Sequence, residues 1–117
     1  MSLPAADLLE SSPGRDRRTA SRLNWNAKAH CRLRIEGAAE APILERRDIS
    51  IGGFGLVLGQ AFGAGSILKV DLSNPARGFT CSRQVQVKYA VLGGDGHWLT
   101  GFAFLERLED RELEALS

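Results

Sequence analysis

Apolar and polar residues alternate along several stretches of this chain, which is the pattern of strands that bury one face. The clearest stretch is 28–36, where every odd position is apolar and every even position is polar or charged. Similar but less regular runs follow it, separated by glycine-rich or Asn-Pro turns. The pattern predicts six strands, over residues 28–36, 43–50, 54–58, 66–72, 80–92 and 97–105.

The strand predicted at 80–92 is the longest, and we expect it to bury a single face along its whole length. That face carries Val85, Val87, Tyr89 and Val91. The segment Gly93-Gly94-Asp95-Gly96 has the composition of a hairpin turn. It joins this strand to the next one, which turns Phe102 and Phe104 to one side.

Residues 109–117 are predicted to form a short C-terminal helix. Its acidic residues cluster in the first turn, where the helix dipole favours negative charge, and Leu113 and Leu116 give it one apolar side. Short antiparallel strands in this number usually close into a small barrel, because closure removes the exposed edges of the sheet. The predicted fold class is therefore all-β with a small α addition: a six-stranded antiparallel β-barrel with a C-terminal helix.

The composition agrees with one globular domain and adds detail to its organisation. The 117 residues are too few for two independent cores, and 13 glycines suit short strands and tight turns. The net charge of +1 hides a basic segment at 14–34 and an acidic one at 105–117. We predict a flexible N-terminal segment over 1–14 and a domain over 15–117, made of a basic arm (15–25), the barrel (26–105) and the helix (109–117).

The sequence also predicts where the protein is found. Residues 1–14 contain Asp7 and Glu10 and show neither the basic start nor the apolar run of a signal peptide. No stretch reaches the roughly 20 apolar residues of a membrane span. Cys31 and Cys81 lie far apart in strand-like segments, so we expect two reduced, half-buried thiols rather than a disulfide. These features predict a cytoplasmic protein.

Two short motifs combine residues that are suited to binding a nucleotide. Arg18-Thr-Ala-Ser-Arg22 places two guanidiniums four residues apart before the first strand, and Asp48-Ile-Ser-Ile-Gly-Gly53 closes the second strand. With these motifs the sequence resembles the PilZ domain family, bacterial receptors for cyclic di-GMP whose signatures are RxxxR and [D/N]xSxxG. The later Gly101-Phe-Ala-Phe104 also matches, and the resemblance covers about residues 15–117. It implies a β-barrel that binds cyclic di-GMP.

The chemistry of the motif residues agrees with this ligand, which offers two phosphates and two guanines. An arginine pairs bidentately with phosphate or with guanine O6 and N7, and an aspartate accepts from the N1–H and amine of guanine. On this interpretation Arg18 and Arg22 bind phosphate or guanine, and Asp48 binds the guanine edge. Ser50 assists them, and Gly53 shapes the turn so that the backbone can approach the ligand closely.

Three further residues bear on the ligand site. The position before RxxxR is associated with ligand number in PilZ domains, where an arginine goes with a stacked pair of ligand molecules. Arg17 occupies that position here, so the resemblance implies two cyclic di-GMP molecules per chain. Arg15 is a secondary candidate that adds to the same positive field. Trp98 is another, because it could stack on a guanine, although its place in the strand equally suits the core.

No catalytic site, metal or cofactor is expected. His30 and His97 have no partners at metal-ligand spacing, and the sequence contains neither a catalytic triad nor a dinucleotide-binding fingerprint. We therefore expect a single-domain receptor rather than an enzyme. Its arm would fold over the bound nucleotide, and the protein would signal to a separate, unidentified protein.

The sequence leaves two alternative functions open. One is a small β-barrel that binds nucleic acid through its basic arm, and the other is a PilZ-like adaptor that binds no nucleotide. An aromatic content of 7%, with Phe102 and Phe104 assigned to the core, speaks against nucleic acid, which is bound largely by stacking on exposed rings. The intact motifs speak against the adaptor.

Overall fold

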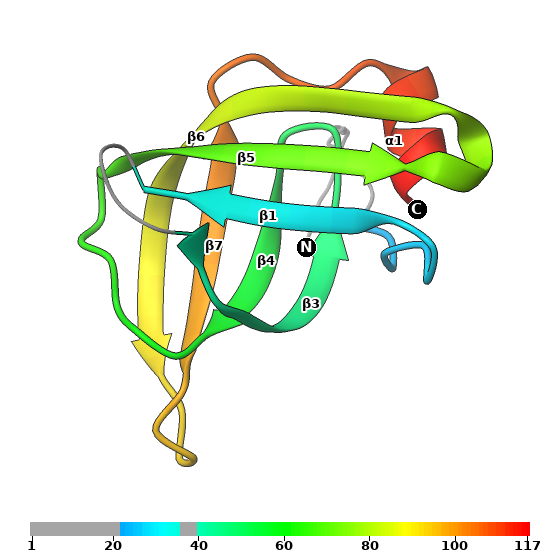
Figure 1. Ribbon diagram of the computed structural model, residues 1–117. Coiled ribbons are helices and arrows are strands. Elements are labelled where there is room, and N and C mark those ends of the chain that lie inside the picture. The colour runs from blue at the N-terminus through cyan, green and yellow to red at the C-terminus, as the bar shows by residue number, and fades with distance from the viewer. Residues whose placement is uncertain (1–21, 36–39) are drawn as a thin grey trace, which may run out of the picture.

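Seven antiparallel strands form one sheet in the computed structural model, which describes residues 22–35 and 40–117. The strands are β1 (His30–Arg34), β2 (Glu40–Ala41), β3 (Ile43–Ile49), β4 (Gly53–Leu58), β5 (Ile67–Asn74), β6 (Phe79–Leu92) and β7 (Trp98–Phe104). A 3₁₀ turn, η1 (Pro75–Arg77), follows β5, and one helix, α1 (Asp110–Leu116), follows β7. The order across the sheet is β2-β1-β5-β6-β7-β4-β3, and the sheet curls into a half-barrel (Figure 1).

The predicted fold class is confirmed, with one correction to the number of strands. All six predicted strands are present, and β2 is an additional two-residue strand that pairs with the end of β1. Two residues are too few to show alternation, which is why the sequence pattern missed it. The predicted helix at 109–117 is α1. The predicted flexible segment at 1–14 lies outside the described residues, and within them no helix has the length and apolar character needed to cross a membrane.

The long strand β6 belongs to both halves of the sheet. It pairs with β5 along residues 79–86 and with β7 along residues 85–92. Figure 1 shows it bend from the direction of β5 into that of β7. A bulge between Val87 and Tyr89 interrupts the second ladder. Because a bulge adds one residue to one strand of a pair, it bends that strand and increases its twist.

The bulge corrects the predicted burial of β6. Val85 and Val87 are buried as expected, but Tyr89 and Val91 are 46% and 54% exposed. Side chains alternate between the two faces of a strand, so one extra residue moves every later side chain to the opposite face. Residues 89–92 are all apolar, so the sequence gives no sign of the change of face, and continuing the alternation past Lys88 predicts the wrong face for Tyr89 and Val91.

Aromatic rings form the centre of the core between β4 and β7. Phe54, which is 1% exposed, stacks on Phe102 with ring centroids 5.0 Å apart and contacts Phe104 at 5.2 Å. The rings of Trp25 and Phe54 meet nearly at right angles, with centroids 5.9 Å apart. Such pairs contribute about 0.5–1.5 kcal/mol each beyond the burial of the rings. The cluster holds the segment before β1 against β4 and β7.

Both cysteines are free thiols that are partly buried, as the sequence predicts. Burial raises the pKa of Cys31 to about 12, although the positive charge of Arg46 opposes the shift. Burial also raises the pKa of Cys81 above its ordinary value. Because the thiolate is the reactive form of cysteine, a raised pKa lowers the reactivity of both thiols at neutral pH.

Polar contacts hold helix α1 against the sheet. Nη2 of Arg83 on β6 donates to both carboxylate oxygens of Glu112, at 2.8 and 2.7 Å. The same carboxylate accepts from the backbone N–H of Glu109 at 2.8 Å, as part of a capping box at the start of the helix. Near the other end of α1, Asn74 Nδ2 donates to the carbonyl of Ala115 at 2.7 Å. The helix is therefore fixed at both ends.

The Arg83–Glu112 pair predicts a dependence of stability on pH. Burial alone would raise the pKa of Glu112, but the N–H of Glu109 and the guanidinium of Arg83 hold it below its ordinary value of 4.5. A carboxylate with a lowered folded pKa stabilises the fold above the unfolded pKa, and this contribution is lost as the pH falls through the folded value. Glu112→Gln should therefore reduce the free energy of unfolding at neutral pH by about 1–3 kcal/mol.

Urea denaturation at pH 7 and at a series of values below pH 4.5 measures this effect. The stability of Glu112→Gln should depend less on acid pH than that of the unaltered protein. Glu114→Gln is the matched control, because Glu114 is exposed on the same helix. Equal acid dependence in the Glu112→Gln variant and the unaltered protein would contradict the assignment.

Candidate functional site

The end of the basic arm is hydrogen-bonded to the end of β3. Leu23 and Ile49 exchange both of their backbone hydrogen bonds, at 2.8 and 2.9 Å. Two residues later, the indole N–H of Trp25 donates to the backbone carbonyl of Asp48 at 3.1 Å. These contacts hold the last residue of the RxxxR motif, Arg22, beside the first residue of the DxSxxG motif.

Arg22 and Asp48 are in direct contact, although 26 residues separate them in the sequence. Nη1 of Arg22 lies 3.1 Å from Oδ1 of Asp48, and the two side chains are 57% and 40% exposed. An ion pair this exposed contributes about 0–1 kcal/mol to stability. Its importance is positional, because it places a cation and a carboxylate at one edge of the sheet.

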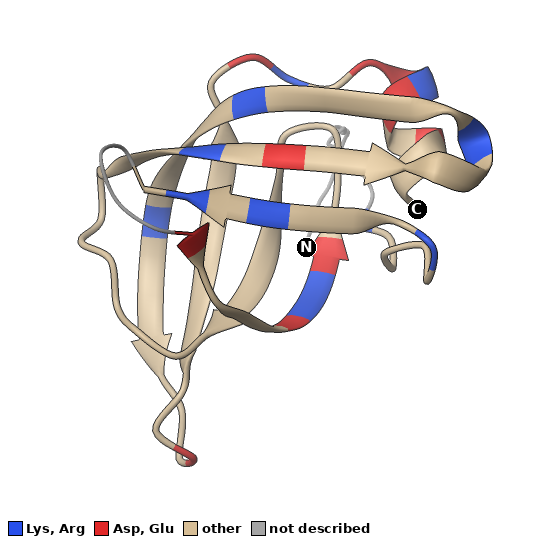
Figure 2. Cartoon of the chain, in the orientation of Figure 1, with Lys and Arg blue, Asp and Glu red and all other residues tan. Residues whose placement is uncertain are grey.

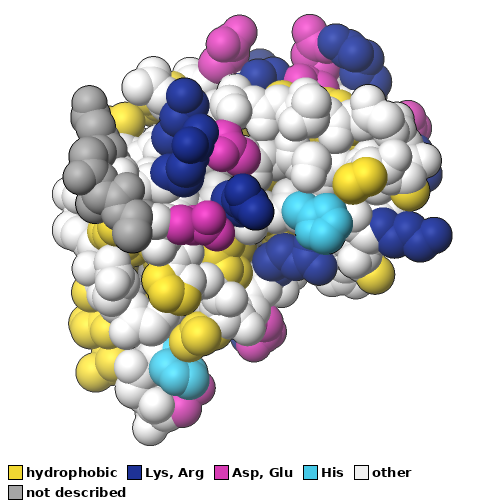
Figure 3. All heavy atoms as spheres, in the orientation of Figure 1, with side chains coloured by type: hydrophobic (Ala, Val, Ile, Leu, Met, Phe, Trp, Pro, Cys, Tyr) yellow, Lys and Arg dark blue, Asp and Glu magenta, His cyan; other side chains and the backbone are white. Residues whose placement is uncertain are grey.

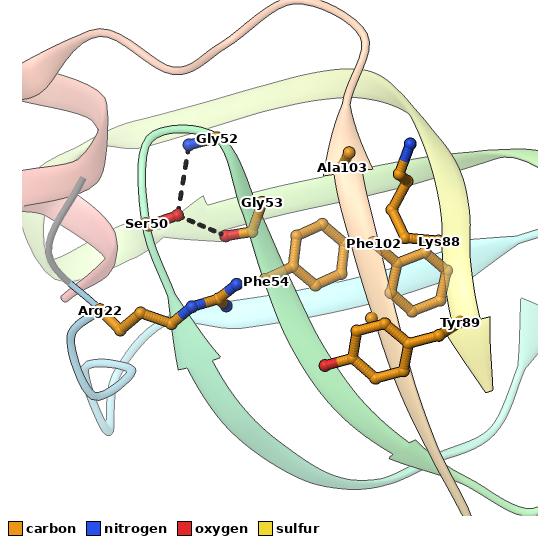
Figure 4. A pocket seen from close by; sticks show the side chains of 10 residues that line it. Arg22, Ser50, Gly52, Gly53, Phe54, Lys88, Tyr89, Phe102 and Ala103 are labelled. Carbon is orange, nitrogen blue, oxygen red and sulfur yellow. Dashed lines mark hydrogen bonds between the residues drawn. The ribbon is translucent and has the colours of Figure 1, made fainter. Parts of the chain in front are cut away.

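Ser50 organises the turn that joins β3 to β4. Its side chain is buried, its backbone N–H donates to the carbonyl of Gly53 at 2.8 Å, and its hydroxyl contacts that carbonyl at 3.3 Å. The hydroxyl also accepts from the N–H of Gly52 at 3.3 Å, and Figure 4 shows both hydroxyl contacts. The serine of the motif therefore fixes the backbone conformation at the site.

Glycines make the outer face of β4 and β7 nearly bare backbone. Gly53 and Gly55 alternate with the buried Phe54, and they lie opposite Ala103 and Gly101 of β7. A Cβ atom on Gly55 would lie 2.9 Å from Oδ1 of Asp48. Figure 2 shows that β4 and β7 carry no charged residue. The glycines therefore let neighbouring groups of the protein pack closely against this uncharged face.

Tyr89 covers the far side of this glycine surface. A Cβ atom on Gly101 would collide with the ring of Tyr89, so the ring lies directly against the backbone of β7. The bulge in β6 directs Tyr89 to this outer face, and the preceding Lys88 is also exposed. The sequence pattern proposed neither residue for the site, because it set Tyr89 on the face of Val85 and Val87 and Lys88 on the opposite face. The available signal was Gly101, which leaves room for a large side chain on the neighbouring strand.

These residues line a pocket of about 320 Å³. Arg22 borders it on the side of the arm, Ser50 and Gly53 come from the β3–β4 turn, and Lys88 and Tyr89 come from β6 (Figure 4). The volume is at the lower end of the range of about 300–1,000 Å³ that is typical of small-molecule sites. The pocket is therefore large enough to accommodate part of a small-molecule ligand.

The structure brings together four of the eight residues that the sequence proposes for the site. They are Arg22, Asp48, Ser50 and Gly53. Arg15, Arg17 and Arg18 lie outside the described residues. Trp98 begins β7 at the hairpin, opposite Leu58 and Leu92, and does not line the pocket. In the described part of the chain, no group of three or more His, Cys, Asp or Glu residues could hold a metal ion.

A model of the PilZ domain family matches residues 16–117. The chain belongs to the PilZ domain family. The residues of its two signature motifs that the structure describes converge on one end of the β3–β4 turn, beside the pocket. No curated protein sequence matches this PilZ domain.

Two solved structures share the fold of this PilZ domain. The Bacillus subtilis inhibitor of motility (MotI/DgrA) has a TM-score of 0.60 and 19% identity, covering 89% of this chain and 53% of its own. The complex of MrkH with c-di-GMP from K. pneumonia has a TM-score of 0.63 and 21% identity, covering 86% of this chain and 49% of its own. This PilZ domain spans about half the length of either structure, and at this identity the likeness concerns the fold.

The close approach at Gly53 predicts a difference between two adjacent glycines. Gly53→Ala should destabilise the protein by about 1–3 kcal/mol, because overpacking forces the backbone to move. The new methyl group would collide with the carbonyl oxygen of Phe102 on the paired strand. Gly52→Ala is the matched control, since nothing lies within 4 Å of its Cβ position. Urea denaturation compares the two variants, and equal stabilities would contradict the assigned role of Gly53.

Proposed function

We propose that this PilZ domain is a receptor for cyclic di-GMP, which it binds in the pocket between the arm and β6. The observation that carries the proposal is the contact of Arg22, which lines that pocket, with Asp48, whose carboxylate lies 3.1 Å from the guanidinium. It joins one residue of each signature motif into a single site. A protein of the same fold, solved as a complex with c-di-GMP, supports the choice of ligand.

Each part of the site offers a group that this ligand can use. The guanidinium of Arg22 binds phosphate or the O6 and N7 of guanine through its planar fork. The carboxylate of Asp48 accepts from the N1–H and amine of the same base. The exposed ring of Tyr89 offers the base a face or edge for stacking. Lys88 supplies a further positive charge for phosphate.

The Arg22–Asp48 pair is replaced by contacts with the ligand at little cost. An exposed pair contributes about 0–1 kcal/mol, whereas hydrogen bonds to charged groups contribute about 1.5–3 kcal/mol each. Until ligand arrives, the pair holds both side chains at the rim of the pocket. Binding therefore exchanges one weak contact for several stronger ones.

The remainder of the arm completes the site in this proposal. Arg17 and Arg18 precede Arg22 and bring two further guanidiniums within a few residues of the pocket. The phosphates of the ligand attract them, so the arm folds over the nucleotide and the free energy of these contacts drives the change. The altered surface is then available to a downstream protein. The downstream protein and the cytoplasmic location of this domain stay predictions.

The nucleic-acid alternative gains no support from the charges on the face formed by β1 and β5. On the face formed by β1 and β5, Arg34 pairs with Asp71 at 2.9 Å, and Arg32 lies 3.9 Å from Glu40 of β2. Figure 3 shows positive and negative side chains mixed over this face. Proteins that bind nucleic acid through its phosphates present a basic patch or stripe instead.

Isothermal calorimetry with the full chain tests the proposal. Cyclic di-GMP should bind, and cyclic di-AMP should bind far more weakly, because adenine has no donor pair for Asp48. Asp48→Asn should weaken the binding of cyclic di-GMP, since its amide turns one acceptor into a donor that faces another donor. Equal binding of the two cyclic dinucleotides would contradict the role of Asp48. Binding of single-stranded DNA in place of either would favour the nucleic-acid alternative.

Arg22 provides a second prediction with a control in the same chain. Arg22→Ala should weaken the binding of cyclic di-GMP by about 1–3 kcal/mol, the value of one good bidentate pair. Arg22→Lys should restore little of this loss, because an ammonium cannot reproduce the planar fork. Arg47→Ala is the control, since Arg47 is 52% exposed and pairs with Glu45. Unchanged affinity in Arg22→Ala would remove Arg22 from the site.

The number of bound ligands forms a third prediction. We expect two cyclic di-GMP molecules per chain, because Arg17 occupies the position that is associated with a stacked ligand pair. A stacked pair carries four phosphate charges, which an additional guanidinium compensates. Arg17→Leu should reduce the stoichiometry to one and keep tight binding of the first molecule. A calorimetric stoichiometry near one for the unaltered protein would contradict the prediction for Arg17 and leave that for Arg22 and Asp48 standing.

A further inference from the structure

Trp25 lies where the basic arm meets the half-barrel, and it contacts three parts of the protein. Its indole N–H donates to the carbonyl of Asp48 at 3.1 Å. Its ring lies nearly perpendicular to the ring of Phe54, with the ring centroids 5.9 Å apart. The guanidinium of Arg46 lies 5.6 Å from the centre of the indole ring. The residue therefore links the arm to β3 on one side and to the aromatic core on the other.

Arg46 is itself fixed in place. Its side chain leaves β3 and donates to the backbone carbonyl of Ala29, just before β1, and reaches the carbonyl of Asn26 at 3.5 Å. The side chain thereby connects β3 with the segment just before β1, although β3 and β1 are not neighbours in the sheet. A cation held against an indole face in this way contributes about 0.5–2 kcal/mol. Arg46 therefore restricts the position of the Trp25 ring.

Neither Trp25 nor Arg46 lines the ligand pocket, so neither is placed to touch the nucleotide. Both are nevertheless connected to residues that do line or border it. Trp25 contacts the backbone of Asp48 directly, and through Phe54 it supports Phe102, which stacks on Phe54 at 5.0 Å. A change at Trp25 would consequently move the carboxylate that Arg22 and the ligand share.

We infer that Trp25, held by Arg46, is a positioning residue for the cyclic di-GMP site. The inference rests on the proposed function and adds to it a role for two residues outside both motifs. Trp25 fixes the root of the arm relative to Asp48, so that Arg22 starts in the geometry that binding requires. A group that is ordered in advance loses less conformational entropy when ligand binds, which increases affinity. Without the indole contact, residues 22–24 are tied to β3 by the backbone bonds of Leu23 with Ile49.

A purely structural role for Trp25 makes a different prediction. A residue that only stabilises the fold lowers the free energy of unfolding when it is replaced, and it leaves the affinity of the folded molecules unchanged. A positioning residue lowers the affinity of molecules that are fully folded. It also acts through Arg22, so its effect depends on whether Arg22 is present. The coupling between the two residues is therefore the decisive measurement.

Two variants remove the proposed contacts with little change in shape. Trp25→Phe keeps an aromatic ring against Phe54 and Arg46 and deletes the indole N–H. Arg46→Met keeps an unbranched apolar stem and deletes the guanidinium. Arg47→Met is the matched control on the adjacent position of β3, because Arg47 is 52% exposed and pairs with Glu45. The titrations are carried out at a temperature at which circular dichroism shows that all variants are folded.

Calorimetric titration of the full chain with cyclic di-GMP then gives Kd for each variant. Trp25→Phe and Arg46→Met should each raise Kd about tenfold, the upper end of what it costs to order one long side chain on binding. Arg47→Met should leave Kd within about twofold, as expected for an exposed pair. In an Arg22→Ala background, Trp25→Phe should raise Kd by less than about threefold, since residues that act as a unit are not additive.

The possible results separate this inference from the proposed function. An unchanged Kd in Trp25→Phe, or an equal rise in the presence and absence of Arg22, would overturn the positioning role and leave the receptor proposal intact. Failure of the unaltered protein to bind cyclic di-GMP would overturn the receptor proposal and this inference together. A tenfold loss that disappears in the Arg22→Ala background would support both.

Discussion

The half-barrel and its site both depend on one strand, β6, which is hydrogen-bonded to β5 in its first part and to β7 in its second. The two ladders overlap at Val85 and Gln86, so the strand has to change direction soon after them. The bulge before Tyr89 accommodates this bend. A regular β6 would direct Tyr89 into the core and leave the pocket without one of its walls. The curvature of the sheet and the shape of the site thus have a common cause.

Backbone geometry contributes as much to the site as charged side chains do. The carbonyl of Phe102 and the ring of Tyr89 occupy the space that side chains at Gly53 and Gly101 would need. The resulting surface is uncharged, and the charged groups lie at its rim, where Arg22 and Lys88 remain accessible to solvent. An apolar surface with a few polar groups at its edge is the usual composition of a small-molecule site.

The sequence predicted those features of the protein that are determined by residues close together in the chain. Alternation predicted six of the strands and the buried face of β1, and the two signature motifs predicted that Arg22, Asp48, Ser50 and Gly53 belong together. The face of Tyr89 was predicted wrongly, because the apolar run at 89–92 carries no mark of a bulge. The hydrogen bond from Trp25 to Asp48 joins residues 23 positions apart, a contact that one sequence does not reveal.

The contact between Arg22 and Asp48 also determines how strongly the site attracts other anions. The two opposite charges lie 3.1 Å apart, so together they present a dipole rather than a net positive charge to solvent. A free phosphate or a mononucleotide gains little by approaching a dipole, because its attraction to the cation is offset by repulsion from the carboxylate. A ligand that supplies donors for the carboxylate and acceptors for the guanidinium at once avoids this cancellation. Charge compensation within this pair therefore favours a ligand with both donors and acceptors over a simple phosphate ion.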